Sequence, residues 1–121
     1  MTHRTLIVAR MDPDNVENVA GAFRASDSTE LPHMIGVTRR TLLRFHGLYF
    51  HLVEAEDDIS ERLYRARSHS RYQELNTELA RYIRPYDPGW KEPKDAMAQP
   101  FYSWTADNAA HARSCSSCDC R

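Results

Sequence analysis

The sequence predicts a single α+β domain with an antiparallel sheet, and three features of the 121-residue chain indicate this. Two strand-like runs, residues 37–45 and 48–54, flank a two-residue turn and predict a β-hairpin. A short apolar run and a segment of helical periodicity precede the hairpin, and a second helical segment follows it. The order strand, helix, strand, strand, helix needs one last strand to complete a small sheet with helices on one face.

The first strand and the first helix lie in residues 5–25. Residues 5–11 form an apolar run without breakers, which is typical of a central strand. Asp12 supplies an N-cap and Pro13 the first helical position. Apolar residues then recur at i, i+3, i+4 and i+7 and predict a helix that ends near Ala25; they are Val16, Val19, Ala20 and Phe23. The polar residues 26–32 are predicted to connect this helix to the hairpin.

The hairpin turn is predicted at His46 and Gly47. A two-residue loop that ends in Gly favours a type I′ turn, because Gly accepts a positive φ without steric cost. That turn places Phe45 opposite Leu48 and so fixes the register of both strands. One face is then apolar and holds Thr41, Leu43, Phe45, Leu48, Phe50 and Leu52, closed by an Arg39–Glu54 pair. The other face holds Arg40, Leu42, Arg44, Tyr49, His51 and Val53.

The second helical region begins after the acidic residues 54–58. Ile59, Leu63 and Ala66 mark a helix that residues 68–70 interrupt. The helical stripe is predicted to resume with Tyr72, Leu75, Leu79 and Ile83. A Pro- and Gly-rich loop, residues 85–93, leads to an aromatic-rich last strand at residues 97–105.

The resulting βαββαβ order is the ferredoxin-like pattern, an antiparallel sheet covered by helices on one face. The other face is left open, and an exposed apolar sheet face of several hundred Å² favours association. We therefore expect a homodimer in which two sheets stack to form an α/β barrel. The predicted domain is residues 1–106.

Composition excludes several classes of protein. The net charge is −1 with His neutral, so no overall field attracts nucleic acid or an anionic membrane. No apolar run reaches the roughly 18–20 residues that span a bilayer, and the first residues show no signal peptide. The sequence therefore predicts a cytoplasmic protein. Among the cations, Arg outnumbers Lys by 14 to 2, and Arg is the better residue for planar recognition of oxygen anions.

All three cysteines, Cys115, Cys118 and Cys120, lie in residues 107–121. Their C-x-x-C-x-C spacing could bind zinc, but three ligands at a chain end with no fourth partner make a weak site. We expect a disordered tail here and no metal site.

Six segments of residues 4–105 resemble the tetracenomycin-cyclase-like (TcmI-type) aromatic polyketide cyclases in order and spacing. They are VARMDP at 8–13, DSTELP at 27–32, GVTRR at 36–40, YFHLVEA at 49–55, RLYRARSH at 62–69 and FYSWT at 101–105. The resemblance implies a cofactor-free, dimeric enzyme of type II polyketide and antibiotic biosynthesis. Such enzymes close a ring in a poly-β-ketone-derived intermediate by intramolecular aldol condensation and dehydration. It also implies a homodimer, with acyl carrier protein or other polyketide synthase components as candidate partners.

The resemblance also implies site residues. The family site has a His–Asp pair after the first helix, an Arg on the second strand and a His on the third. The matching residues here are Asp27, Arg40 and His51, while Ser26 stands where the pair has its histidine. Ser26 cannot titrate near neutral pH, so its residue type does not support a general-base role at this position.

The candidate catalytic residues have structural alternatives. His51 is expected to act as an acid–base group, with a reference pKa of about 6.5, or to polarise a carbonyl; the alternative is a hydrogen-bonded strand residue. Arg40 is expected to stabilise developing oxyanions, or else to be a solvated or ion-paired residue. Asp27 is expected to orient a base or bind a hydroxyl, or else to cap a turn. The candidate substrate contacts are Ser26, Arg44, Tyr49 and Trp104.

Three functions stay open at this point. The first is the cyclase, in which folding the substrate so that one carbon pair meets should outweigh any single titrating residue. The second is a cofactor-free monooxygenase of the same fold that oxidises an anthrone-like ring. The third is a non-catalytic protein that binds a polyketide or its carrier protein. Oxygen uptake distinguishes the second, and turnover by the purified protein excludes the third.

Overall fold

The computed structural model describes residues 2–91 and 93–106. In chain order its elements are β1 (His3–Met11), the 3₁₀ helix η1 (Pro13–Asn15), α1 (Val16–Asp27), α2 (Leu31–Ile35), β2 (Val37–Phe45), β3 (Leu48–Ala55), α3 (Ser60–Ala66), α4 (Ser70–Leu79), β4 (Ile83–Pro85) and the 3₁₀ helix η2 (Pro93–Ala96). The strands form one sheet in the order β2-β3-β1-β4, with every neighbouring pair antiparallel. This is the predicted ferredoxin-like α+β architecture.

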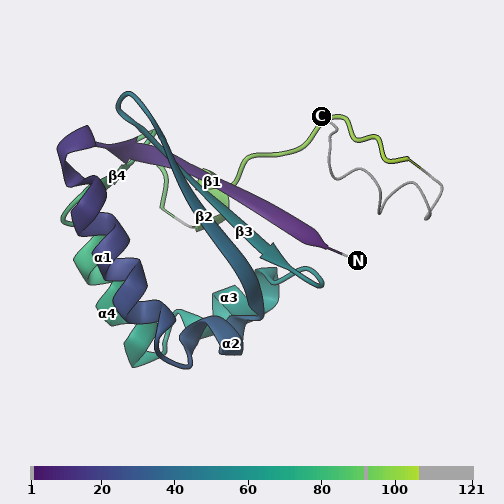
Figure 1. Ribbon diagram of the computed structural model, residues 1–121, viewed down its shortest axis with the longest axis horizontal. Helices are drawn as coiled ribbons and strands as arrows, with labels where there is room; N and C mark the ends of the chain where they lie inside the picture. Colours follow the sequence, from purple (N-terminus) through teal and green to yellow (C-terminus); the bar gives the residue numbers. More distant parts are fainter. Residues whose placement is uncertain (1, 92, 107–121) are drawn as a thin grey trace.

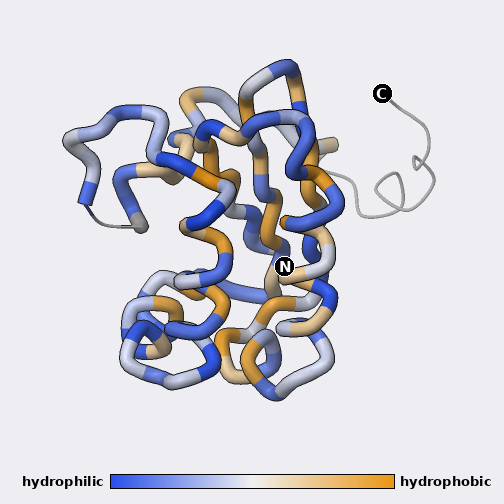
Figure 2. Tube along the Cα trace, turned by 90° about the vertical axis from the view of Figure 1, so that its left-hand side faces the viewer, coloured by the Kyte–Doolittle hydropathy of each residue, from blue (hydrophilic) through white to orange (hydrophobic). Residues whose placement is uncertain are grey.

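All four α-helices lie on one side of the sheet (Figure 1). Burial therefore alternates along β3: Tyr49, His51, Val53 and Ala55 face the helices and are buried, and the residues between them are half-buried. Figure 2 shows the matching alternation of hydrophobic and hydrophilic residues along the strands. The helices therefore cover the face of the hairpin that carries the candidate site residues, and they leave the apolar face open. Among the described helices, none has the length and apolar character to cross a bilayer.

The register of the hairpin is confirmed. Phe45 pairs with Leu48 and Leu42 with His51, and Arg39 lies opposite Glu54 with an Nε–Oε2 distance of 3.8 Å. The type I′ turn is wrong, because that turn needs a positive φ at both central residues and only His46 has one, at 53°. After Asn and Asp, His is among the non-glycine residues that tolerate this conformation best.

The core consists of two clusters on the helix side of the sheet. One joins β3 to α2 and α3 and contains Leu31, Ile35, Val53, Ala55, Ile59 and Ala66. The other joins β1 and β3 to α1 and contains Ala9, Met11, Val19, Phe23 and Tyr49. Leu75 of α4 packs against both. The two clusters thus hold the helix layer onto the sheet at separate places.

The connector predicted at residues 26–32 is wrong in two respects. The first helix continues to Asp27, so Ser26 and Asp27 are helical. The second short helix, α2, follows, because Leu31 and Ile35 are spaced i, i+4 and both become buried against the sheet. Gly36 ends it with a φ of 97°, a conformation that glycine adopts without strain.

The predicted last strand is also wrong. The fourth strand is β4, in which Ile83 pairs with Met11 of β1 and does not extend α4. Residues 98–106 contain no strand; Met97 forms a single bridge with Ile7, and the Ala98 N–H donates to the Leu6 carbonyl at 2.7 Å. Three aromatic side chains of this segment are largely exposed, namely Phe101, Tyr102 and Trp104. The predicted tail at 107–121, with its cysteines, lies outside the described residues.

Candidate functional site

A cavity of about 470 Å³ lies between the sheet and the helix layer. The sheet contributes Arg40, Tyr49 and His51 to its wall, and Phe23, Leu63 and Leu75 are among the residues contributed by the helices. Most of the lining side chains are apolar, and the polar ones are few. Such a space suits a flat, largely apolar small molecule that a few polar groups orient.

Arg40 is the centre of the polar part of the wall. Its Nη2 donates to Asp27 Oδ1 at 2.7 Å, and its Nε donates to Asp27 Oδ2 at 3.1 Å. Its Nη1 lies 2.8 Å from His51 Nε2, and its Cζ lies 4.7 Å from the centroid of the Phe23 ring. These contacts use three of the five N–H groups of a guanidinium and fix its plane. Two donors remain for a ligand.

His51 is buried on β3, with 7% of its surface exposed. Burial and, to a smaller degree, the charge of Arg40 lower its pKa from 6.5 to about 3. The ring is therefore neutral near pH 7. Because a guanidinium can only donate, Nε2 accepts from Arg40 and the ring proton lies on Nδ1. His51 in this state is a hydrogen-bond donor, and its one basic nitrogen is already occupied.

Tyr49 lies two residues before His51 on the same face of β3, with the two ring centroids 6.3 Å apart. It is buried, and burial raises the pKa of its phenol further than the charge of Arg40 lowers it. The hydroxyl therefore stays protonated at neutral pH. Tyr49 adds a third protein donor, or an acceptor through its lone pairs, to the same wall of the cavity.

The arrangement is suited to negative charge on oxygen. Arg40, the Nδ1–H of His51 and the Tyr49 hydroxyl can all donate to an enolate or alkoxide in an environment that excludes water. The pKa values of His51 and Tyr49 are both moved away from 7, which is the value a general base needs at neutral pH. The site thus stabilises charge well and exchanges protons poorly, and the expected titration of His51 near pH 6.5 is wrong because the ring is buried.

The structure brings four of the seven predicted site residues together. Asp27, Arg40, Tyr49 and His51 form one connected group, although Asp27 reaches the cavity only through Arg40. Asp27 is half-exposed at the end of α1, where it fixes the guanidinium. The hairpin register placed the three strand residues on one face, and the family resemblance pointed to Asp27.

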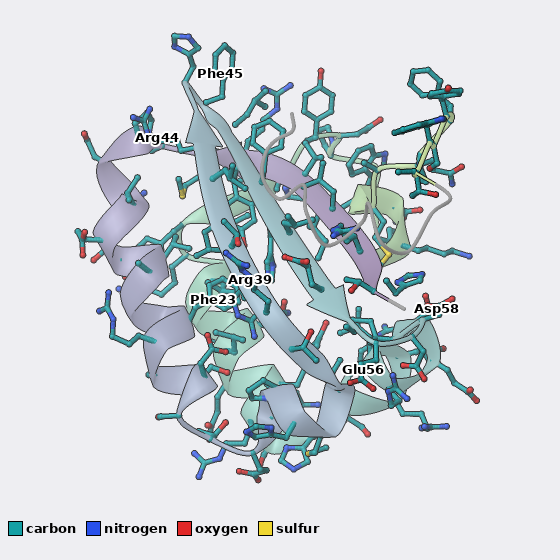
Figure 3. All side chains as sticks on the ribbon, turned by 45° about the vertical axis from the view of Figure 1, so that its right-hand side comes forward. Phe23, Arg39, Arg44, Phe45, Glu56 and Asp58 are labelled. Carbon is teal, nitrogen blue, oxygen red and sulfur yellow. The ribbon has the colours of Figure 1, made fainter. Side chains whose placement is uncertain are left out.

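The other three lie elsewhere. Ser26 lines a separate cavity of about 200 Å³ between α1 and α4, where its hydroxyl is buried with no hydrogen-bond partner among the described residues. It points away from Asp27 because adjacent helical residues are about 100° apart. Arg44 is exposed next to Phe45 at the hairpin tip (Figure 3) and does not line the main cavity. Trp104 is 73% exposed and does not line it either.

The cavity also has helical residues that were not predicted as site residues. Phe23 lies between α1 and the sheet, behind β2 in Figure 3, and its ring contacts both Arg40 and His51. Arg67, which follows α3, and Tyr72, in the first turn of α4, also line the cavity. The periodicity of Phe23 and Tyr72 indicated only a buried helix face, and Arg67 gave no signal besides its charge.

Comparison with known proteins agrees with this geometry. Residues 3–105 match the family described as polyketide synthesis cyclase. The tetracenomycin F2 cyclase of Streptomyces glaucescens is 56% identical over 109 residues, which cover 90% of this chain and all of the relative. A protein of Streptomyces cyaneus named polyketide synthase CurG is 40% identical over 106 residues, covering 87% of this chain and 99% of the relative.

A solved structure of tetracenomycin F2 cyclase from Streptomyces glaucescens, described as a type-II polyketide cyclase, superimposes with a TM-score of 0.81. It is 58% identical and covers 86% of this chain and 98% of that chain. Sequence and fold therefore agree over nearly the whole described length. The chain belongs to the polyketide synthesis cyclase family.

Proposed function

We propose that this protein is an aromatic polyketide cyclase that closes a ring of a poly-β-ketone-derived intermediate without a cofactor. The observation that supports this best is the gathering of Arg40, His51 and Tyr49 as donors on the wall of a mostly apolar cavity. Aldol chemistry on such a substrate develops charge on carbonyl oxygens, and these donors are placed to hold that charge.

The reaction consists of proton removal, attack and loss of water. A methylene flanked by carbonyls loses a proton to solvent or to a basic group of the substrate, and its enolate oxygen accepts from Arg40 and His51. The enolate carbon attacks a second carbonyl of the same chain, forming the ring bond, and the new alkoxide takes up a proton. Elimination of the resulting hydroxyl with a neighbouring hydrogen releases one water molecule and forms one C=C bond. Proton shifts that convert the remaining ring carbonyls to enols then make the ring aromatic, with no further change in composition.

The shape of the cavity contributes more than any single group. Holding the two reacting carbons of a flexible chain in contact can lower the activation free energy by roughly 7–11 kcal/mol in favourable cases. A single acid–base group is typically worth a factor of about 10²–10⁴ in rate. Ser26 faces away from the main cavity and His51 is neutral, so neither is available as a general base. The proposed rate enhancement therefore comes from substrate positioning and from stabilisation of charge.

Incubation of the purified protein with an uncyclised or partly cyclised poly-β-ketone tests the function. We expect one product that is lighter than the substrate by one water, formed faster than in buffer and without oxygen uptake. Oxygen consumption with a product one oxygen heavier would instead identify the monooxygenase. Acceleration only in the presence of another synthase component would identify the accessory role.

We also propose that two copies associate through the open sheet face, in the cytoplasm. That face includes Leu43 and Phe45, which are exposed, and Phe50 and Leu52, which are half-buried. An uncovered apolar face of this kind favours a second sheet. Sedimentation at micromolar concentration should show a dimer, and Phe50→Asp should shift it to monomer; a wild-type monomer would refute the proposal.

A further inference from the structure

The charges on the cavity wall are all of one sign. Among the described residues that line it, Arg40, Arg67, Arg84 and Lys91 carry positive charge, and no Asp or Glu is present. The chain as a whole is nearly balanced, with 17 acidic and 16 basic residues. Arg84 and Lys91 are exposed, and Asp27 neutralises Arg40. Arg67 is the remaining cation and is half-buried.

Arg67 is held in place without a carboxylate. It follows α3 at the C-cap, and its Cζ lies 4.8 Å from the centroid of the Tyr64 ring. Among the described residues it forms no salt bridge, whereas Arg65 of the same helix pairs with Glu61. Stacking on an aromatic face leaves the N–H groups at the edge of the guanidinium free, and those groups bind oxyanions. Its charge is therefore oriented but not neutralised.

Tyr72 lies beside this charge. It is in the first turn of α4, lines the cavity and packs against the apolar core. Burial raises the pKa of its phenol in spite of the nearby Arg67, so the hydroxyl is a protonated donor at neutral pH. That hydroxyl forms no hydrogen bond with any described residue. A guanidinium that forms no salt bridge and a phenol that forms no hydrogen bond with the described residues thus line the same helical wall, close enough for the charge of Arg67 to act on Tyr72.

We propose that Arg67, assisted by Tyr72, is a second oxyanion-binding subsite of the cavity and that it holds an anionic oxygen which the substrate carries before reaction. The inference rests on the proposed function and extends it to the substrate, an aromatic polyketide with a carboxylate or phenolate group. Arg40 projects from the sheet and stabilises charge that develops during the reaction. Arg67 lies across the cavity and anchors charge that is already present, so it is a positioning residue.

Binding of simple aromatic probes tests this without turnover. The probes are 2-naphthoate, 2-naphthol and 2-naphthamide, which present a carboxylate, a phenol and a neutral amide on one ring system. Trp90 lines the cavity and reports binding by fluorescence. Trp104→Phe removes the other tryptophan of the chain, which is exposed and does not line the cavity.

We expect 2-naphthoate to bind more tightly than 2-naphthamide, and Arg67→Met to weaken naphthoate about tenfold while changing naphthamide little. Arg67→Lys should restore part of the preference, because it keeps the charge and loses the planar fork. Arg65→Met is the matched control, an exposed cation of the same helix that does not line the cavity. A preference for 2-naphthol that grows as it ionises would assign the subsite to phenolates.

Equal loss of naphthoate binding in Arg67→Met and Arg65→Met would overturn the inference, as would equal affinity for naphthoate and naphthamide in the parent protein. Circular dichroism verifies that each variant is folded, and Tyr72→Phe gives a second, milder variant of the same subsite. If the protein cyclises its substrate but Arg67→Met leaves naphthoate affinity unchanged, only the subsite inference fails. If naphthoate binds through Arg67 but no ring closes, the cyclase proposal fails instead.

Discussion

The two faces of the β2–β3 hairpin lie in opposite environments. The face that carries Arg40, Tyr49 and His51 lies beneath the helices, and the face that carries Phe45 and Phe50 is open. A sheet with one wet side normally exposes its polar residues and buries its apolar ones. This hairpin has the opposite arrangement, with polar residues covered and apolar residues open. The covered polar groups therefore lie where the dielectric constant is low and each electrostatic interaction is strong.

Ion pairs on the two faces show the same difference. Arg40 and Asp27 share a two-point contact in which the Arg40 side chain is 14% exposed. On the open face Glu54, whose side chain is 16% exposed, lies 3.4 Å from Arg4 and 3.8 Å from Arg39, and these two arginine side chains are 63% and 75% exposed. Exposed pairs typically contribute about 0–1 kcal/mol. This contrast agrees with the two proposals above, in which the open face serves association and the covered face serves the chemistry.

Replacement of Arg40 should have the largest effect. Arg40→Met removes the donors nearest the proposed enolate, so turnover should fall about 10²–10³-fold, as for loss of an oxyanion donor. Open-chain and wrongly cyclised products should increase, which product analysis by mass spectrometry detects. Arg39→Met, one residue away on the open face, should change turnover less than twofold. Equal effects of the two variants would show that the covered face is not the site.

Replacement of His51 should have a smaller effect. His51→Ala should lower turnover by about 10²-fold or less, because the ring donates a hydrogen bond and does not exchange protons. With a pKa of about 3, His51 stays neutral across the working range. The pH–rate profiles of wild type and variant should therefore have the same shape between about pH 5.5 and 8. An inflection near pH 6.5 that disappears in the variant would restore the general-base role.

Burial of His51 should also make the protein sensitive to acid. Its pKa is lower in the folded protein, about 3, than in the unfolded chain, about 6.5, so the unfolded chain binds the proton first. The contribution of neutral His51 to the free energy of unfolding is fully present above about pH 6.5. Below that pH the free energy of unfolding should fall by about 1.4 kcal/mol per pH unit. Urea unfolding at several pH values should show this slope in wild type and a smaller slope in His51→Leu. His46→Asn, at the exposed hairpin turn, is the control.

Removal of the ion pairs between Glu54 and its two exposed arginines should have the smallest effect. Glu54→Gln should lower the free energy of unfolding by less than about 1 kcal/mol and leave turnover unchanged, because its partners are solvated. Asp27→Asn is the corresponding change in the pair that holds Arg40, at the half-exposed end of α1; it should loosen Arg40 and slow turnover measurably. Thermal melts measure the stability of both variants and initial rates measure their turnover, which compares an ion pair on each face. A larger stability loss for Glu54→Gln than for Asp27→Asn would contradict the comparison.

Local patterns in the sequence determined the hairpin and much of the site. Alternation along residues 37–54 and the two-residue loop specified the register, and hence that Arg40 and His51 share a face. Asp27 came from the family resemblance, since the periodicity of α1 ended the predicted helix near Ala25, whereas the helix continues to Asp27. Side-chain period and turn length follow from backbone geometry over a few residues, so they can be predicted without knowledge of distant segments.

Only the tertiary structure decided which face is covered, which segment forms the fourth strand and what state His51 adopts. Phe101, Tyr102 and Trp104 have strand propensity, yet Ile83, which follows α4, is the residue that pairs with β1 at this edge of the sheet. Arg67 and Tyr72 join the cavity only when α3 and α4 fold back across the sheet. Burial, and the pKa values that depend on it, arise from segments far apart in sequence, and no local pattern encodes them.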